Sequence, residues 1–178
     1  MRFRVVPILL AVLAALVPVA WSATGPDVGR VASTQPAAVK SPDLWATINV
    51  CDTLTNPDTV GIRGSMPGLP NVSTLWMRFK VQYLATQTDG KWHDVTDNAD
   101  SGWKQVGRLK RKVVEAGQNF MFQPPATGGA HRLRGSVTFK WTRHGHVVLK
   151  VHEVTEAGHR STAGADPEGY SAAVCDIT

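Results

Sequence analysis

Residues 75–83 read Leu-Trp-Met-Arg-Phe-Lys-Val-Gln-Tyr, and this stretch decides the fold class. Large apolar side chains occupy every second position of it. Successive side chains of a β-strand point to opposite faces, so a period of two predicts a strand with one buried and one wet face. The buried face comprises Leu75, Met77, Phe79, Val81 and Tyr83, and the wet face comprises Trp76, Arg78, Lys80 and Gln82.

The same period recurs toward the C-terminus. In residues 133–141 large apolar side chains alternate with polar ones, and residues 147–151 repeat the alternation. The intervening segment, residues 142–145, contains a glycine, which permits the backbone conformation of a tight turn. These residues therefore predict a β-hairpin.

Shorter strands are expected elsewhere, because segments with β-branched and aromatic residues alternate with turn clusters rich in proline, glycine and asparagine. No stretch has a sustained helical stripe of apolar residues. The further strands are predicted at Trp45–Cys51, Thr59–Arg63, Trp103–Val106, Leu109–Val114, Phe120–Phe122 and Ser171–Ile177. Many short antiparallel strands predict an all-β, two-sheet sandwich of the immunoglobulin-like kind over residues 44–178, a length that supports one core.

The chain has two cysteines, Cys51 and Cys175, and neither belongs to a CxxC motif. Outside the cytoplasm an even cysteine count indicates a disulfide. This bridge would join the first strand of the fold to the last. Closing a loop of more than a hundred residues is worth about 4–5 kcal/mol in the chain-entropy description.

The first 22 residues have the pattern of a secretory signal peptide. Arg2 and Arg4 precede an uncharged run over residues 5–20, and Ala20-Trp21-Ser22 offers small residues for cleavage. The run contains two prolines and is shorter than a membrane-spanning helix needs. Residues 23–43 are poor in large apolar side chains and predict a flexible lead-in.

Secretion also bears on charge and partners. Loss of Arg2 and Arg4 lowers the formal net charge from +5 to +3. A mildly basic, exported protein suits anionic surfaces and gives no reason to expect nucleic acid. No second apolar run follows the signal, so no transmembrane span is expected after cleavage.

Two basic features are candidate ligand sites. The wet strand face around Trp76, Arg78 and Lys80 combines an aromatic ring with cations, which suits sugar rings or acidic polymers. The densest basic run comprises Arg108, Lys110, Arg111 and Lys112. Such a run also protects an edge strand from aggregation, and this alternative stays open.

Metal sites are weaker alternatives. His144, His146 and His152 cluster around the predicted hairpin, and imidazoles are ligands for zinc or copper. The acidic loop with Asp94, Asp97, Asn98 and Asp100 offers oxygens to calcium, although its spacing matches no EF-hand loop and such residues also make turns.

No enzyme motif stands out. The nucleophile elbow G-x-S-x-G does not occur in the chain. Its few glutamates give no reason to place a pair across a cleft, as glycoside cleavage requires.

Four segments together resemble a family of small secreted actinobacterial proteins that has no assigned activity. The resemblance rests on residues 45–53, 61–68, 100–103 and 164–175. It covers nearly the whole expected domain and implies no catalytic residues. More loosely, the layout is similar to immunoglobulin-like and fibronectin-like sandwiches, although the cysteine spacing is far wider than in an immunoglobulin domain.

The sequence therefore predicts a secreted, non-enzymatic binding or interaction module without a cofactor, acting at or outside the cell envelope. Its expected partner is an anionic envelope polymer, a carbohydrate or another secreted protein. Two alternatives stay open: a metal-dependent hydrolase that uses the three histidines, and a structural subunit of a surface assembly.

Overall fold

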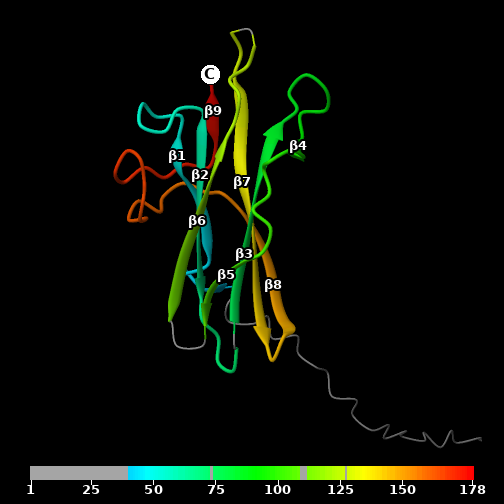
Figure 1. The fold of residues 1–178 in the computed structure, drawn as a ribbon, viewed down its shortest axis with the longest axis vertical. Coiled ribbons are helices and arrows are strands. Elements are labelled where there is room, and N and C mark those ends of the chain that lie inside the picture. Colours follow the sequence, from blue (N-terminus) through cyan, green and yellow to red (C-terminus); the bar gives the residue numbers. More distant parts are fainter. Residues whose placement is uncertain (1–39, 73, 109–111, 127) are drawn as a thin grey trace, which may run out of the picture. The chain divides into compact units, whose positions relative to one another are not determined.

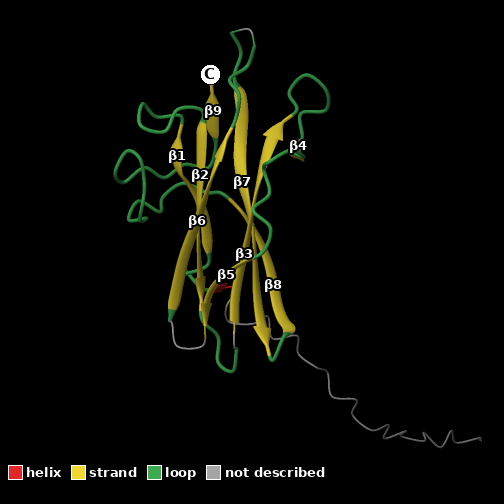
Figure 2. Ribbon diagram, in the orientation of Figure 1, coloured by secondary structure: helices red, strands yellow, loops and turns green. Residues whose placement is uncertain are grey.

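The computed structural model describes residues 40–72, 74–108, 112–126 and 128–178. Within these ranges the chain forms nine β-strands and no α-helix (Figure 1 and Figure 2). The predicted signal peptide and most of the predicted lead-in lie outside the described residues, so both stay predictions.

The smaller sheet has three antiparallel strands. Its order is β1-β2-β6, with β2 in the middle. The strands are β1 (Trp45–Cys51), β2 (Thr59–Pro67) and β6 (Val113–Met121). The predicted strand at residues 45–51 is confirmed to the residue, and the one predicted at residues 59–63 continues to Pro67.

The larger sheet has six strands, and its long central pair is β3 (Thr74–Leu84) with β7 (His131–Arg143). Along one edge of β3, β5 (Lys104–Arg108) and β4 (Trp92–Asp94) pair with its two ends. Two strands also share the outer edge of β7. β9 (Cys175–Ile177) pairs with residues 131–133 of β7, and β8 (His146–Val154) pairs with residues 136–143. All of these pairs are antiparallel, so the predicted two-sheet antiparallel sandwich is confirmed.

The core lies between the two sheets. Its members are the alternate, apolar residues of each strand, as the period of two predicts. They include Ile48, Val60, Ile62 and Met66 from the smaller sheet and Leu75, Met77, Phe79, Val81, Val137, Phe139 and Trp141 from the larger one. Trp141 is fully buried, and its indole Nε1 donates a hydrogen bond of 2.8 Å to the carbonyl oxygen of Pro67 in the opposite sheet.

The predicted hairpin is β7–β8. Its two-residue loop, His144-Gly145, has positive φ at both positions, 48° and 83°. This is the backbone of a type I′ turn, whose twist matches that of the flanking strands. Glycine therefore occupies a position that other residues adopt only with strain.

One strand prediction is wrong in its division. Strands predicted at 109–114 and 120–122 are in fact a single strand, β6, while residues 109–111 lie outside the described residues. Two inward positions of β6 are Ala116 and Gln118, one small and one polar, so the apolar alternation is interrupted. Gln118 accepts a hydrogen bond from Lys104 of β5, which satisfies its polar oxygen at this edge.

The last predicted strand, residues 171–177, is also shorter than expected. Only β9 pairs with β7, whereas Ala172 pairs with β1. The amide nitrogen of Ile48 lies 2.9 Å from the carbonyl oxygen of Ala172, and the reciprocal bond is 3.0 Å. The C-terminal segment thus first binds the free edge of one sheet and then joins the other.

Candidate functional site

The candidate ligand face is the outer surface of the larger sheet. On β3 the residues with buried side chains alternate with half-buried ones, so Trp76, Arg78 and Lys80 all face away from the core. Their partners across the ladder are Lys140, Thr138 and Ser136 of β7. The structure therefore brings the three predicted residues of β3 onto one surface.

Arg78 and Lys80 form ion pairs on this surface. Arg78 Nε donates to both carboxylate oxygens of Asp100, at 2.8 and 3.1 Å. Lys80 Nζ donates to Asp94 Oδ2 at 2.6 Å. These hydrogen bonds lower the pKa of Asp100 and of Asp94 below the usual range of a carboxyl group. The middle of the face is therefore neutralised by carboxylates from the β4–β5 region.

Nearer the N-terminal end of β3 than these ion pairs lies a group of aromatic and cationic side chains. We term it the Trp–Lys cluster, and its members are Trp76, Trp103, Lys140 and Lys150. Lys140 Nζ lies 3.9 Å from the centroid of the Trp103 ring and 4.9 Å from that of Trp76. Lys150 Nζ lies 5.7 Å from the Trp103 centroid. Within the described residues no carboxylate lies within 4 Å of either ammonium, so the cluster carries positive charge.

Strand register builds this cluster. Trp76 lies opposite Lys140, and Lys140 lies opposite Lys150, so the three form a row across β3, β7 and β8. Trp103 comes from the residue just before β5. Trp76 is further oriented by a 3.3 Å hydrogen bond from its Nε1 to Thr142 Oγ1.

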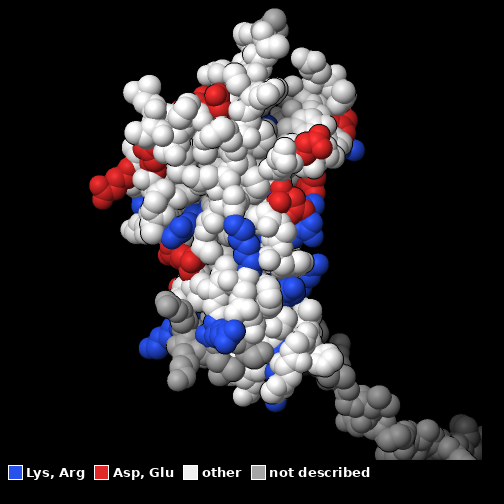
Figure 3. Space-filling model, in the orientation of Figure 1, with Lys and Arg blue, Asp and Glu red and all other residues white. Residues whose placement is uncertain are grey.

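Figure 3 shows the charge pattern of the viewed face. Along the right-hand side of that view, basic and acidic atoms adjoin in the upper part, and basic atoms continue below them.

A second cation–aromatic contact lies nearer the other end of β3, where the Arg134 guanidinium carbon is 4.5 Å from the Trp92 ring centroid. Arg134 Nε also donates to Gln82 at 2.8 Å.

The structure describes only the two ends of the basic run, Arg108 and Lys112. Arg108 ends β5 of the larger sheet, whereas the carbonyl of Lys112, one residue before β6 of the smaller sheet, accepts a bond from the amide of Gly68. Lys110 and Arg111 lie outside the described residues. The two described ends therefore adjoin different sheets, and both the ligand-binding role and the edge-protecting role of the run stay predictions.

The histidines do not gather into a metal site. His144 is in the hairpin turn and His146 begins β8, while His152 lies six residues further along the same strand, roughly 20 Å away at the usual rise. His152 lies instead between Ser136 and Thr138, 3.4 Å from each hydroxyl. Among the described residues no group of three or more His, Cys, Asp or Glu side chains could hold a metal ion. The acidic loop likewise directs Asp94 and Asp100 to cations of β3.

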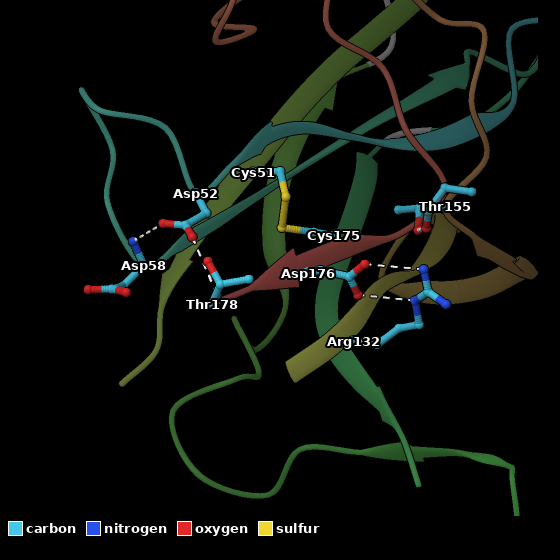
Figure 4. The surroundings of a disulfide bond; sticks show 9 residues. Cys51, Asp52, Asp58, Arg132, Thr155, Cys175, Asp176 and Thr178 are labelled. Atoms are coloured by element: carbon cyan, nitrogen blue, oxygen red, sulfur yellow. Dashed lines mark hydrogen bonds and ion pairs between the residues drawn. A yellow bond between two sulfur atoms is a disulfide. The ribbon is translucent and has the colours of Figure 1, made fainter. Parts of the chain in front are cut away.

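The predicted disulfide is present. The Cα atoms of Cys51 and Cys175 are 5.5 Å apart, and the bridge connects β1 of one sheet with β9 of the other (Figure 4). Arg132 of β7 makes two hydrogen bonds, of 3.0 and 3.1 Å, to the carboxylate of Asp176 beside the bridge. Asp52 Oδ1 accepts a 2.8 Å bond from the amide of Asp58, which shapes the loop after β1. The bridge and the two bonds from Arg132 hold β9 in place.

Sequence reasoning missed three members of the Trp–Lys cluster: Trp103, Lys140 and Lys150. The alternation placed both lysines on wet faces, but it did not align them with Trp76. The short hairpin loop was the available signal, because a two-residue loop sets which residues of β7 and β8 lie opposite one another. Nothing in the local sequence places Trp103 beside them.

In the described part of the chain, no helix has the length and apolar character needed to cross a membrane. The chain matches no family model and no curated protein, so its resemblance to small secreted actinobacterial proteins stays a prediction.

Proposed function

We propose that the protein is a secreted, non-enzymatic binding module that holds an anionic polymer of the cell envelope against the outer face of its larger sheet. One observation carries the proposal: Lys140 Nζ lies close to two indole rings, Lys150 Nζ lies near one of them, and no carboxylate of the described residues is within 4 Å of either ammonium.

The arrangement suits an acidic ligand that also has apolar surface. Lysine is a strongly hydrated point charge with three donors, so it attracts acidic groups without demanding one geometry. The indole rings hold the ammonium in place and add apolar contact area beside it. Because a sheet face is extended, successive acidic groups of a linear polymer have room to follow the row Trp76–Lys140–Lys150.

Secretion is part of this proposal. The pattern of residues 1–22 and the disulfide support it, since disulfides persist in oxidising compartments. The partner is then a polymer outside the cytoplasm.

The experiment measures the affinity of the oxidised protein for three polymers: polygalacturonate, polyglutamate and neutral dextran. We expect polygalacturonate to bind most tightly, because it offers both carboxylates and sugar rings, and dextran not to bind. Raising the salt concentration should weaken the interaction, because exposed charges are screened. Lys140→Gln and Trp103→Ala should each weaken binding at least about tenfold, as expected when a hydrogen bond to a charged group or its aromatic support is lost.

Two control variants separate this site from other sources of positive charge. Lys91→Gln removes an exposed cation next to β4 and should leave the affinity within about twofold of the wild type. Lys112→Gln removes an exposed cation of the basic run and should likewise leave the affinity within about twofold. Equal losses in Lys91→Gln and Lys140→Gln would show that only net charge matters and would reject the cluster as the site.

A further inference from the structure

The outer face of the smaller sheet has an arginine with unused hydrogen-bonding capacity. Arg63 lies in the middle of β2, opposite Thr47 of β1 and Gly117 of β6. Its Nε is buried and has no hydrogen-bond partner among the described residues. Its ionic neighbour is Glu115, whose Oε2 lies 3.7 Å from Nε, too far for a hydrogen bond. A buried donor without an acceptor is costly, so such groups call for an explanation.

Arg63 lines a pocket of about 320 Å³. The pocket lies between the outer face of β2 and β6 and the C-terminal segment. Its other lining residues are Asn49, Ile62, Gly117, Gln118, Asn119, Ala163 and Gly164. This volume is at the lower end of the range for small-molecule sites.

One wall of the pocket is held by Asn49. This residue is 4 % exposed, and its Nδ2 donates to the carbonyl oxygens of Ala163 and Gly164, at 3.4 and 3.0 Å. The amide of Asp166 also donates to the carbonyl of Asn49, at 2.8 Å. The wall is therefore fixed to β1 by three hydrogen bonds.

Gly117 leaves the space that Arg63 occupies. A Cβ at this position would lie 3.1 Å from Arg63 Cδ and 3.2 Å from its Nη1. The arginine stem thus packs directly on the backbone of β6. This contact restricts where the guanidinium can move and keeps it at the pocket.

We propose that this pocket binds the carboxylate of a small organic acid, with Arg63 as the donor. The planar guanidinium matches a carboxylate with two parallel hydrogen bonds, which its terminal nitrogens would donate because Nε itself is buried. Arg63 and Glu115 carry opposite charges, so a ligand with one negative charge meets less repulsion there than one with two. The site is independent of the Trp–Lys cluster, which lies on the other sheet.

The experiment is a ¹H–¹⁵N NMR titration of the oxidised protein. The signals followed are Arg63 Nε–Hε and the amides of Gly117, Asn119 and Gly164. The titrants are acetate, sulfate, galacturonate and N-acetylalanine, with chloride at equal ionic strength as the reference. Acetate should cause saturable shifts at these signals. Tighter binding of galacturonate would identify a sugar acid as the source of the carboxylate, and tighter binding of N-acetylalanine would identify a peptide C-terminus.

Variants give the decisive comparison. Arg63→Lys keeps the charge but loses the planar fork, so it should weaken binding at least about tenfold. Glu115→Gln removes the competing carboxylate and should tighten binding several-fold. Arg132→Gln removes an arginine from a remote ion pair and should change nothing.

The proposal fails if the shifts do not saturate, if sulfate binds better than every carboxylate, or if Glu115→Gln leaves the affinities unchanged. The Glu115→Gln result decides the matter even if Arg63 variants do not fold. Polygalacturonate binding at the other sheet should persist in Arg63→Lys, so the two proposals are tested separately.

Discussion

Asp166 shows how one carboxylate joins two distant loops. Its Oδ2 accepts hydrogen bonds from the hydroxyls of Thr53 and Thr55 and, at 2.7 Å, from Asn56 Nδ2. These three donors belong to the loop between β1 and β2, whereas Asp166 belongs to the C-terminal segment. The donors favour the ionised form, so the pKa of Asp166 lies below its usual range.

This lowered pKa predicts how the stability of Asp166→Asn depends on pH. Above the pKa that Asp has in the unfolded chain, about 3.9, the ionised carboxylate stabilises the fold. This contribution is lost as the pH falls through the lower pKa of the folded state. The wild type should therefore be more stable than Asp166→Asn at pH 7, and the difference should close as the pH falls below about 4. Urea unfolding at a series of pH values measures it.

Asp43→Asn is the matched control, because within the described residues no hydrogen bond to the Asp43 carboxylate is present. It should follow the wild type at every pH. A gap between wild type and Asp166→Asn that persists unchanged at pH 2 would contradict the argument.

At the scale of elements, β7 is one of the two central strands of the larger sheet and pairs with three other strands. Gly135 on this strand lies opposite Val81 of β3 and faces Ile62 across the core. Its amide donates to Thr155 Oγ1 at 3.0 Å, and that hydroxyl is 2.6 Å from the carbonyl oxygen of Ala173. The close approach of Thr155 requires a residue without a side chain at this point.

Gly135→Ala should therefore destabilise the protein. The new Cβ would lie 2.5 Å from Thr155 Cγ2 and 2.9 Å from Ile62 Cδ1, so both neighbours must move. Overpacking of this kind costs about 1–3 kcal/mol of unfolding free energy, and the lower entropy of an unfolded chain with alanine offsets only part of it. Denaturant unfolding of the oxidised protein measures the loss.

The comparison variant is Gly64→Ala on β2, where the new Cβ would come no closer than 3.3 Å to the Phe139 ring. Its loss of stability should be smaller. If the two variants lose equal stability, the contact with Thr155 does not explain the glycine.

At the scale of the whole molecule, the disulfide joins residues 124 positions apart and connects one sheet to the other. Cys175 is buried beside the apolar core, so the bridge also contributes packing. Its main effect is on the unfolded chain, in which it holds residues 51 and 175 together.

Replacing both cysteines by alanine should lower the unfolding free energy by about 2–5 kcal/mol, because the unfolded chain gains conformational freedom. Chemical unfolding under oxidising conditions checks this, and the wild type treated with a reductant should approach the variant. An unchanged unfolding midpoint in the double variant would show that the bridge does not stabilise the fold by restricting the unfolded chain.

The sequence by itself determined the fold class, the central strand β3, the β7–β8 hairpin and the disulfide pairing. The physical reason is local: a strand that buries one face needs an apolar residue at every second position, and residues 75–83 meet this condition. The pairing followed from elimination, since two cysteines allow one bridge. The prediction was wrong at β6, where Ala116 and Gln118 occupy inward positions at an open edge and a large apolar side chain is not required.

Only the tertiary structure decided which charges are neutralised and which remain available. Arg78 and Lys80 look like a free cationic pair in the sequence, yet their carboxylates come from residues 22 and 14 positions away. Lys140 meets Trp103 through register across several strands, and Arg63 lines one pocket with Ala163 and Gly164 of the C-terminal segment. Such contacts depend on how distant segments align, and one-residue changes of register move a side chain to the other face, so local sequence does not encode them.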